Sequence, residues 1–370
     1  MGLPRRTGFE DQLGHRPLPL QQTILETVGV CAPGFAPVID SRADARTRGR
    51  SPIRVLIVKR AMMDAAAPGP STSELAEWCV RWLDAAPARL LWSRHHLSHV
   101  FGIELVDARE VVVKVRTDTS RITATIEVQR SLADAGFPAP RPLVGPRPIS
   151  DAIATAETLV AGGVQLQWDE DAPNRFASAL ADLVRLAPAV PPEVLAPPPA
   201  WVWWDHEFSG LWPPADDRPF DLNTMPPTRV DEAARHARTR LSDYSAPSVV
   251  GHCDWESQNM RWTNGRLHVV HDWDSVVARP EATIAGAAGA VYPSTGETFA
   301  ATVDQSAAFL AAYETAQGLS WTRDDHEAYW AAGLWVRAFN AKKESGDDPP
   351  PPSLAQFHAE VDERIRLAGG

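Results

Sequence analysis

Hydrophobic positions early in the patterned part of the chain follow a helical period and then give way to short strand-like runs. Residues 71–74, Ser-Thr-Ser-Glu, have the composition of a capping box. Behind it, apolar side chains recur at the i, i+3, i+4, i+7, i+8 spacing of one helix face: Leu75, Trp78, Cys79, Trp82 and Leu83. Strand-like runs rich in apolar residues follow at 90–92, 100–106 and 111–115. The pattern predicts a helix and then a small sheet with a turn at 107–110.

The rest of the chain is mostly helical in its pattern. A helix is expected from about 122 to 136, capped at 118–120, then an extended crossing at 137–143 and strands at 153–160 and 163–167. Helical periodicity returns at five places: 171–184, 229–241, 299–313, 330–342 and 354–365. Strands followed by helices are typical of the α+β class. We therefore expect a bilobal fold with a small N-terminal β-rich lobe and a larger, mainly helical C-terminal lobe.

A hairpin predicted at 261–270 brings the most informative polar residues together. Its Asn264-Gly265 pair is the strongest short-range signal for a tight turn, because both turn positions need a positive φ. Folding about this turn places Asn259 and Asp272 two ladder positions apart, about 7–8 Å at the backbone. An amide oxygen and a carboxylate so placed can share one Mg²⁺. Asp254, on the loop before the hairpin, supplies a separate carboxylate that can accept a proton.

These residues form a pattern that resembles a known family. His252-x-Asp254-x-x-x-x-Asn259, followed by Asp272-Trp273, is similar to the catalytic and metal-binding loops of the aminoglycoside phosphotransferase and choline-kinase-like family, which has a protein-kinase-like fold. The resemblance covers roughly residues 85–343. It implies an enzyme that transfers the γ-phosphoryl of ATP, or of GTP, to a substrate hydroxyl. By the same resemblance Asp254 is the catalytic base, and Asn259 and Asp272 bind Mg²⁺.

A lysine in the strand at 111–115 is the expected phosphate ligand. Lys114 lies among valines, and an ammonium there needs a counter-charge, a ligand or water. A solvent-facing lysine on an edge strand is the alternative. Strand lysines of the family contact nucleotide phosphates and pair with a helix glutamate. Glu127 is the best-placed acid for that pair, and Asp134, near the helix end, is the competitor.

The rest of the expected nucleotide site departs from the common kinase pattern. The loop that would cover the phosphates, residues 96–102, contains a single glycine in place of Gly-x-Gly-x-x-Gly. We assign Ser98 and Gly102 to it on the resemblance alone. Backbone groups from Thr158 to Val160 are expected to meet the base of the nucleotide.

A cluster of tryptophans marks a candidate acceptor site. Residues 201–208 read Trp-Val-Trp-Trp-Asp-His-Glu-Phe, and another tryptophan follows at 212. The aromatic side chains either pack the helical lobe or wall a pocket in which rings stack on the substrate. In the second case Trp204 contacts the acceptor, and Asp205 and Glu207 supply counter-charge. The acceptor itself stays open among aminoglycosides, macrolides, choline-like amines, sugars and amino acids.

The composition of the chain argues against some classes of binding partner. The 370 residues contain 36 Lys and Arg against 47 Asp and Glu, a formal charge of −11 without a long basic block. Nucleic acid is therefore not an expected partner. No run approaches the roughly 20 apolar residues of a membrane span. The three cysteines lack metal-ligand spacing and favour a reducing, cytoplasmic location. Cys79 is expected in the core, and Cys253 is assigned no chemistry. The expected assembly is a monomer or a homodimer.

The predicted organisation has three parts. Residues 1–70 contain scattered Pro, Gly and Arg and a single short apolar patch at 53–58, and are expected to be a disordered extension. Met62 or Met63 is an alternative start of the native protein. Residues 71–160 are expected to form the nucleotide-binding lobe, and residues 161–370 the catalytic and acceptor-binding lobe.

Two other functions fit parts of the pattern. A catalytically silent nucleotide-binding module would keep the same residues without turnover. A two-metal hydrolase would instead use His252, Asp254, His271 and Asp272 as metal ligands. In the kinase reading His252 braces the loop, and His271 and Asp274 are structural, with Asp274 a candidate support for the metal ligands.

Overall fold

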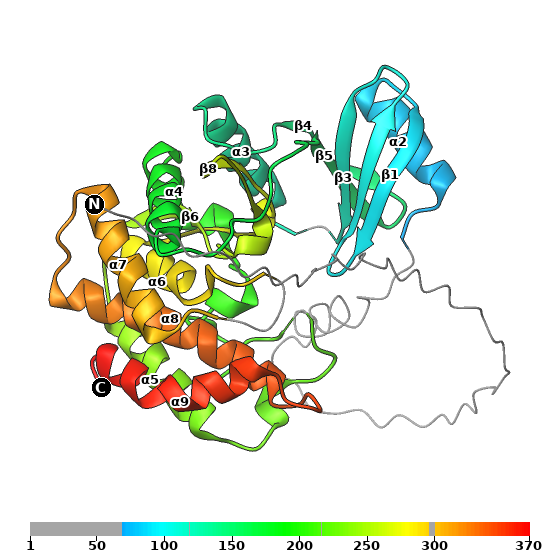
Figure 1. The fold of residues 1–370 in the computed structure, drawn as a ribbon. Helices are drawn as coiled ribbons and strands as arrows, with labels where there is room; N and C mark the ends of the chain where they lie inside the picture. Colours follow the sequence, from blue (N-terminus) through cyan, green and yellow to red (C-terminus); the bar gives the residue numbers. More distant parts are fainter. Residues whose placement is uncertain (1–68, 118, 216, 296–299) are drawn as a thin grey trace, which may run out of the picture. The chain divides into compact units, whose positions relative to one another are not determined.

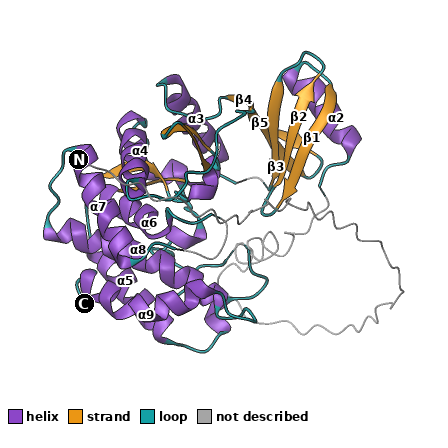
Figure 2. Ribbon diagram, in the orientation of Figure 1, coloured by secondary structure: helices purple, strands orange, loops and turns teal. Residues whose placement is uncertain are grey.

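The computed structural model describes residues 69–370 except 118, 216 and 296–299 (Figure 1). The expectations for residues 1–68, including the disordered extension and the alternative start, lie outside the described part, as do Asp118 of the expected cap and Phe299. Figure 2 shows the predicted α+β division, with the strands of one antiparallel sheet followed by a mainly helical region. The fold class is confirmed.

The N-terminal sheet consists of five antiparallel strands in the order β1-β2-β3-β5-β4. Helix α2 (Thr72–Leu83) precedes it and begins with the predicted capping box of Ser71 and Glu74. Cys79 is buried on this helix, as expected. The strands are β1 (Pro87–His95), β2 (His99–Leu105), β3 (Glu110–Arg116), β4 (Pro142–Ile149) and β5 (Ala152–Thr158).

Alternation along β3 separates a core face from a ligand face. Val111, Val113 and Val115 pack with α2 in the core of this part of the chain. Lys114 and Arg116 lie on the other face, because successive side chains of a strand point to opposite sides. The register pairs Lys114 with Thr155 of β5, so β5 side chains two residues apart share this face with the lysine.

Helix α3 (Ile122–Asp134) connects β3 to β4 at the expected place. Its N-cap is Arg121, and no side-chain hydrogen bond caps it, so the cap expected at 118–120 is not found among the described residues. Strand β4 was missed, because its three prolines and one glycine favour an irregular crossing over a strand. The strand expected at 163–167 is reduced to a single bridge between Val164 and Trp262.

The C-terminal part combines helices with two small two-stranded sheets. One sheet pairs β6 (Ser248–His252) with β9 (Val276–Pro280), and the other is the predicted hairpin of β7 (Met260–Thr263) and β8 (Arg266–Val270). The helices are α4 (Ala172–Leu186), α5 (Arg229–Asp243), α6 (Glu281–Val291), α7 (Val303–Gln317), α8 (Arg323–Glu344) and α9 (Pro352–Leu367). In the part of the chain described, none of the helices combines the length and the apolar character of a membrane span.

Helix α6 has no counterpart among the predicted elements. After Glu281 its residues are apolar or small on every side, so it lacks the amphipathic stripe that reveals a surface helix. It packs against α8 at very short range. A Cβ atom placed on Gly286 would lie 2.0 Å from the backbone oxygen of Tyr329, so only glycine allows this approach. The close packing of α6 and α8 supports the strands β6 and β9 that carry the candidate site.

Candidate active site

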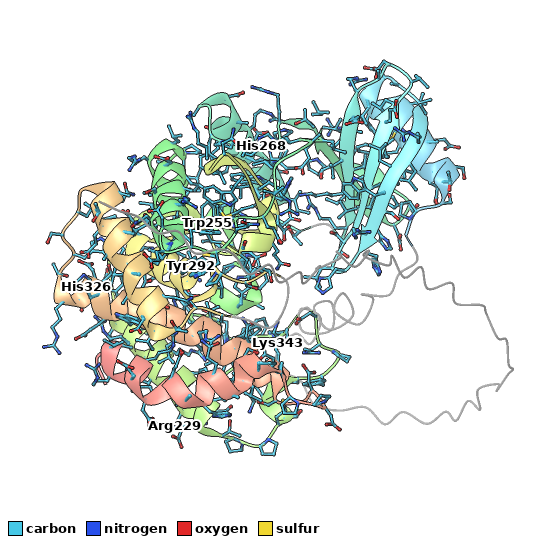
Figure 3. The ribbon with its side chains drawn as sticks, in the orientation of Figure 1. Arg229, Trp255, His268, Tyr292, His326 and Lys343 are labelled. Atoms are coloured by element: carbon cyan, nitrogen blue, oxygen red, sulfur yellow. The ribbon has the colours of Figure 1, made fainter. Side chains whose placement is uncertain are left out.

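The loop after β6 is held by a buried histidine. His252 Nε2 donates to the carbonyl oxygens of His271 (3.1 Å) and Asp272 (3.0 Å), and its Nδ1 accepts from the Asp254 amide (3.3 Å). Burial lowers the pKa of His252 to about 4, so the ring is neutral at pH 7 and can donate and accept at once. The expected bracing role of His252 is confirmed. The next tryptophan, Trp255, is buried and donates to the carbonyl of Phe176 (Figure 3).

The hairpin forms as predicted, with a shift of one residue. Asn264 and Gly265 have φ of 53° and 73°, as the turn requires. A bulge between Arg261 and Trp262 pairs Met260, and not Asn259, with Val270. Asn259 therefore lies just before the strand, where its carbonyl oxygen accepts from the His271 amide at 2.8 Å. The bulge brings Asn259 one position closer to Asp272 than the simple ladder did.

Asn259 and Asp272 line the same cavity, which has a volume of about 1140 Å³. The Asn259 Nδ2 donates to the carboxylate (2.8 Å) and the carbonyl (3.0 Å) of Asp254. These two hydrogen bonds fix the orientation of the Asn259 side-chain amide and leave its Oδ1 atom available to a ligand. Asp272 has φ 61° and ψ 51°, a left-handed conformation that Asp tolerates, and its carbonyl is tied to His252.

This donor set fits Mg²⁺. Among the described residues no hydrogen bond reaches Asn259 Oδ1 or the Asp272 carboxylate. Two hard oxygen donors of this kind suit an ion that fills its remaining positions with water and phosphate oxygens. Burial raises the pKa of Asp272, and the charges of Lys114 and Arg116 act in the opposite direction.

Asp254 lies behind Asn259 and is not among the described residues that line the cavity. Burial raises its pKa well above the usual range, and the charges of Glu256 and Asp272 act in the same direction. A carboxylate with a raised pKa is a stronger proton acceptor than an ordinary aspartate. Its position in hydrogen-bond contact with Asn259 places it next to the candidate metal ligand.

Lys114 has a different partner from the one expected. Its Nζ lies 3.3 Å from Glu157 Oε1 on β5, and both side chains are nearly buried. Gln129 of α3 donates to the other oxygen, Oε2, at 2.9 Å. Burial would lower the pKa of Lys114, but Glu157, Asp274 and Asp272 outweigh this effect and raise it. The ammonium is therefore charged and faces the cavity.

The predicted pair of Lys114 with Glu127 is wrong. Glu127 is 61% exposed and binds Arg130 on the same helix. Asp134, the competitor, binds Arg141 at the surface. On α3 the buried stripe passes through Ile126 and Gln129, so Glu127 falls beside the stripe and points away. Gln129 is a polar residue at a position where the helical period places buried side chains. That spacing could have identified it as the partner on α3.

Of the other residues expected to bind the nucleotide, three line the cavity and one does not. Ser98, Thr158 and Val160 line the cavity together with Lys114. Gly102 does not line it. It lies within β2, where an added Cβ would be 2.4 Å from the Trp92 ring, so its absent side chain makes room for that ring. The expectation that Gly102 covers the phosphates therefore disagrees with its position.

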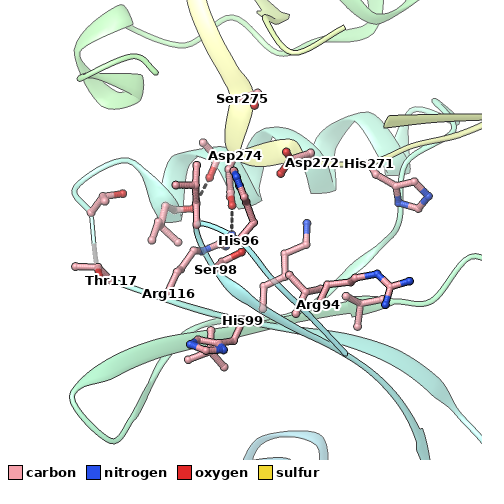
Figure 4. A pocket seen from close by; sticks show the side chains of 18 of the residues that line it. Arg94, His96, Ser98, His99, Arg116, Thr117, His271, Asp272, Asp274 and Ser275 are labelled. Atoms are coloured by element: carbon pink, nitrogen blue, oxygen red, sulfur yellow. Dashed lines mark hydrogen bonds and ion pairs between the residues drawn. The ribbon is translucent and has the colours of Figure 1, made fainter. Parts of the chain in front are cut away.

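A second basic residue on β3 was missed. Arg116 is nine-tenths buried and forms an ion pair with Asp274, while its Nη2 donates to Thr155 at 3.1 Å. Figure 4 shows Asp272 and Asp274 on one side of the pocket and Arg94, Ser98 and Arg116 on the other. The i, i+2 spacing from Lys114 could have revealed it, since alternate strand residues share a face. Asp274, expected to be structural, joins two parts of the chain that are far apart in sequence.

The tryptophan segment divides between core and cavity. Trp204 is buried, with the Arg279 guanidinium 4.8 Å from its ring centroid, and Asp205 forms an ion pair with the same arginine. Glu207 is exposed and does not line the cavity. The cavity wall is instead formed by the neighbouring side chains Trp201, Trp203 and Phe208. The expected substrate contacts of Trp204, Asp205 and Glu207 thus disagree with their positions. The segment does contribute aromatic side chains to the cavity, but these belong to neighbouring residues.

A family comparison decides the class of this protein. Residues 94–329 match the model of the phosphotransferase enzyme family. The chain belongs to this family. This confirms the resemblance, which the sequence motifs had indicated, and the predicted enzyme class, a phosphotransferase with an alcohol group as acceptor. A comparison with curated protein sequences gives no match.

Solved structures with the same fold support the architecture of this phosphotransferase. The amicoumacin kinase hAmiN, solved with AMP-PNP, Ca²⁺ and Ami, has a TM-score of 0.55 at 10% identity, over 76% of this chain and 89% of that one. A putative aminoglycoside phosphotransferase from Ralstonia eutropha has 0.51 at 13%, over 81% and 97%. The aminoglycoside phosphotransferase APH(4)-Ia has 0.50 at 15%, over 81% and 100%. At these identities the likeness shows the fold.

The hydrolase alternative does not fit this phosphotransferase. Within the described ranges, no group of three or more His, Cys, Asp and Glu side chains is arranged to hold a metal ion. His252 uses both ring nitrogens on backbone partners, so neither is available as a ligand. A single Mg²⁺ on one amide and one carboxylate needs no such cluster.

Proposed function

We propose that this phosphotransferase moves the γ-phosphoryl group of ATP, or of GTP, to a hydroxyl of a small molecule with the help of Mg²⁺. One observation carries the proposal: Lys114, Asn259 and Asp272 line one cavity, and Asp254 is hydrogen-bonded to Asn259. In this proposal residues 71–160 form the nucleotide-binding lobe, and residues 161–370 form the catalytic and acceptor-binding lobe. The complex of hAmiN with AMP-PNP and Ca²⁺ supports the binding of a nucleotide and a divalent cation by this fold.

The protein contributes position and charge to the transfer. Lys114, held by Glu157, binds phosphate oxygens with its ammonium. Asn259 and Asp272 would hold Mg²⁺, which neutralises charge on the phosphates when it is bound. Ser98 lines the cavity and can donate a hydrogen bond to a phosphate oxygen. Thr158 and Val160 line the same cavity and would contact the base of the nucleotide.

Asp254 acts on the acceptor hydroxyl. The hydroxyl oxygen attacks the γ-phosphorus, the bond between this phosphorus and the bridging oxygen breaks, and ADP leaves with the electron pair. Asp254 accepts the proton of the hydroxyl as the general base. The hydrogen bond from Asn259 Nδ2 orients the carboxylate for this step.

Slow ATP hydrolysis tests the proposal without knowledge of the acceptor. Water can replace the acceptor hydroxyl in such a site, so wild type with Mg²⁺ should release ADP, and Asp272→Asn should abolish the release. Calorimetry on the same two proteins measures nucleotide binding in parallel. A protein that binds ATP but never releases ADP, with any acceptor in a broad panel, is the silent nucleotide-binding module instead.

A further inference from the structure

One wall of the cavity is aromatic and apolar. Trp201, Trp203 and Phe208 line it, and residues 197–199 add three consecutive prolines. Trp203 and Phe208 meet edge to face, with ring centroids 5.1 Å apart and an interplanar angle of 78°. Phe208 is 37% exposed, so its ring is still open to a ligand. Such a surface favours a ligand that presents an apolar or aromatic face.

This aromatic wall, Trp201, Trp203 and Phe208, is attached next to the proposed base. Trp201 Nε1 donates to the carbonyl of Cys253 at 3.1 Å, and Asp254 is the next residue. A molecule that lies on the wall is thus beside the loop that carries the base. The wall is separate from the residues of β3 and β5 that are proposed to bind the nucleotide, so it is the part of the cavity available to the acceptor.

The segment that carries the wall is fixed to β9 by one arginine. Arg279 donates to the Val202 carbonyl at 3.3 Å and to Asp205 Oδ1 at 2.7 Å, and its guanidinium lies over the Trp204 ring. These three contacts hold both residues that flank Trp203 in sequence. The wall is therefore formed before the ligand binds, which reduces the ordering cost of binding.

The charges of the cavity disfavour a cationic acceptor. Among the described lining residues the carboxylates are Asp151, Glu157, Asp272 and Asp274. Glu157 binds Lys114, Asp274 binds Arg116, and Asp272 is the proposed metal ligand. Asp151 lies in the turn between β4 and β5, at the sheet. The described lining residues therefore offer a substrate amine no free carboxylate at the aromatic wall, and the carboxylate nearest to the wall is the base Asp254, outside the lining.

The basic residues strengthen this conclusion. Among the residues that the structure describes, five Lys and Arg side chains line the cavity: Arg94, Lys114, Arg116, Arg121 and Arg261. Arg121 lies next to the wall, since its guanidinium donates to the Pro197 carbonyl at 3.0 Å. Lys114 and Arg116 are already paired with Glu157 and Asp274. An aromatic ring attracts cations, but an amine at Trp203 would also be repelled by Arg121. The two carboxylates expected to neutralise an amine fail to do so, because Asp205 is bound to Arg279 and Glu207 faces away from the cavity lining.

We infer that the phosphoryl acceptor is an uncharged hydroxyl compound with an aromatic or apolar ring face that stacks on Trp203 and Phe208. This inference rests on the proposed phosphotransfer at Asp254. It makes Trp203 a specificity-determining residue. Polycationic acceptors are excluded by the same surface.

Ligand-detected NMR on the full chain with ADP and Mg²⁺ tests the inference. p-Nitrophenyl β-D-glucoside serves as the uncharged aromatic probe, and kanamycin as the polycationic probe. We expect saturable binding of the glucoside, and Trp203→Ala should raise its Kd by about tenfold or more, the effect of one lost ring contact. Trp168→Ala removes a half-exposed tryptophan outside the cavity lining and should leave the Kd unchanged. Kanamycin should give no saturable binding.

The outcomes separate the two proposals. Saturable kanamycin binding, absence of glucoside binding, or equal glucoside Kd for wild type and Trp203→Ala overturns the inference. If Trp203→Ala does not fold, as judged by its thermal unfolding, Phe208→Ala takes its place with the same expectation. ADP release that depends on Asp272 is measured on the same preparations. If the wild-type protein releases no ADP, the proposed function is wrong. If it releases ADP and also binds kanamycin, only the acceptor inference is wrong.

Discussion

Lys114 Nζ lies 3.3 Å from Glu157 Oε1, so the lysine on β3 takes its counter-charge from the adjacent strand β5. The register makes this contact possible. Lys114 is directly opposite Thr155, and Glu157 is two residues further on the same face, at the diagonal distance that long side chains bridge. Helix α3 contributes through Gln129, which donates to the second oxygen of Glu157. The three residues fix the ammonium at the cavity.

Replacement of Glu157 by glutamine should weaken nucleotide use. The neutral amide leaves the buried Lys114 without its counter-charge, and removal of one partner of a buried ion pair is costly. We expect kcat/KM for ATP to fall by about tenfold or more. Glu127→Gln is the matched control, because Glu127 is exposed on α3 and binds Arg130 of the same helix. Steady-state kinetics of both variants decide the point. Equal losses in the two variants would show that Glu157 supports the lysine no more than the exposed Glu127 does.

Asp254→Ala should lower turnover by about 10²–10⁴-fold, the usual contribution of a positioned acid or base. Nucleotide binding should survive, because Asp254 is not part of the cavity lining. Turnover is measured with a phosphoryl acceptor, and ATP affinity by calorimetry. Asp254→Asn keeps the shape and should fail equally, since the amide cannot accept the proton. Full turnover in either variant would rule out Asp254 as the base.

The ion pair of Arg116 with Asp274 should couple the β3 strand to the metal-binding segment. Asp274 lies two residues after Asp272, so loss of the pair should disturb the position of that carboxylate. We expect Arg116→Met and Asp274→Asn each to raise the Mg²⁺ concentration needed for half-maximal activity. A double-mutant cycle with both changes should be strongly non-additive.

Arg323→Met is the control for that cycle, because Arg323 is 90% exposed and pairs on the surface of α8. Such pairs contribute about 0–1 kcal/mol, and the Mg²⁺ dependence of this variant should match that of wild type. Additive losses in the double variant would mean that Arg116 and Asp274 act independently.

Gly286→Ala should destabilise the protein by about 1–3 kcal/mol or more, as overpacking of a close contact does. The added Cβ would meet backbone atoms of Tyr329, which cannot move aside without separating α6 from α8. Gly145→Ala is the control, because nothing lies within 4 Å of a Cβ at that position. Denaturant unfolding of the two variants measures the difference. A stable Gly286→Ala protein would show that the two helices can separate at little cost.

The sequence by itself determined the features that depend on neighbours along the chain. The hairpin between Asn259 and Asp272 follows from its Asn-Gly turn, and His252, Asp254 and Asn259 lie on one short loop. The capping box at Ser71 and the buried stripe of α2 are equally local. Local turn chemistry and periodicity require only a few adjacent dihedral angles, so a single sequence specifies them.

Only the tertiary structure decided which distant side chains meet. Glu157 is 43 positions from Lys114, and their contact depends on β5 pairing with β3 and on which face of α3 turns inward. The same holds for Arg116 with Asp274, and for the choice of Trp203 over Trp204 as the cavity residue. Side chains one position apart differ by about 100° on a helix and 180° on a strand. Sequence patterns locate such clusters, and packing then selects the residue that faces the site.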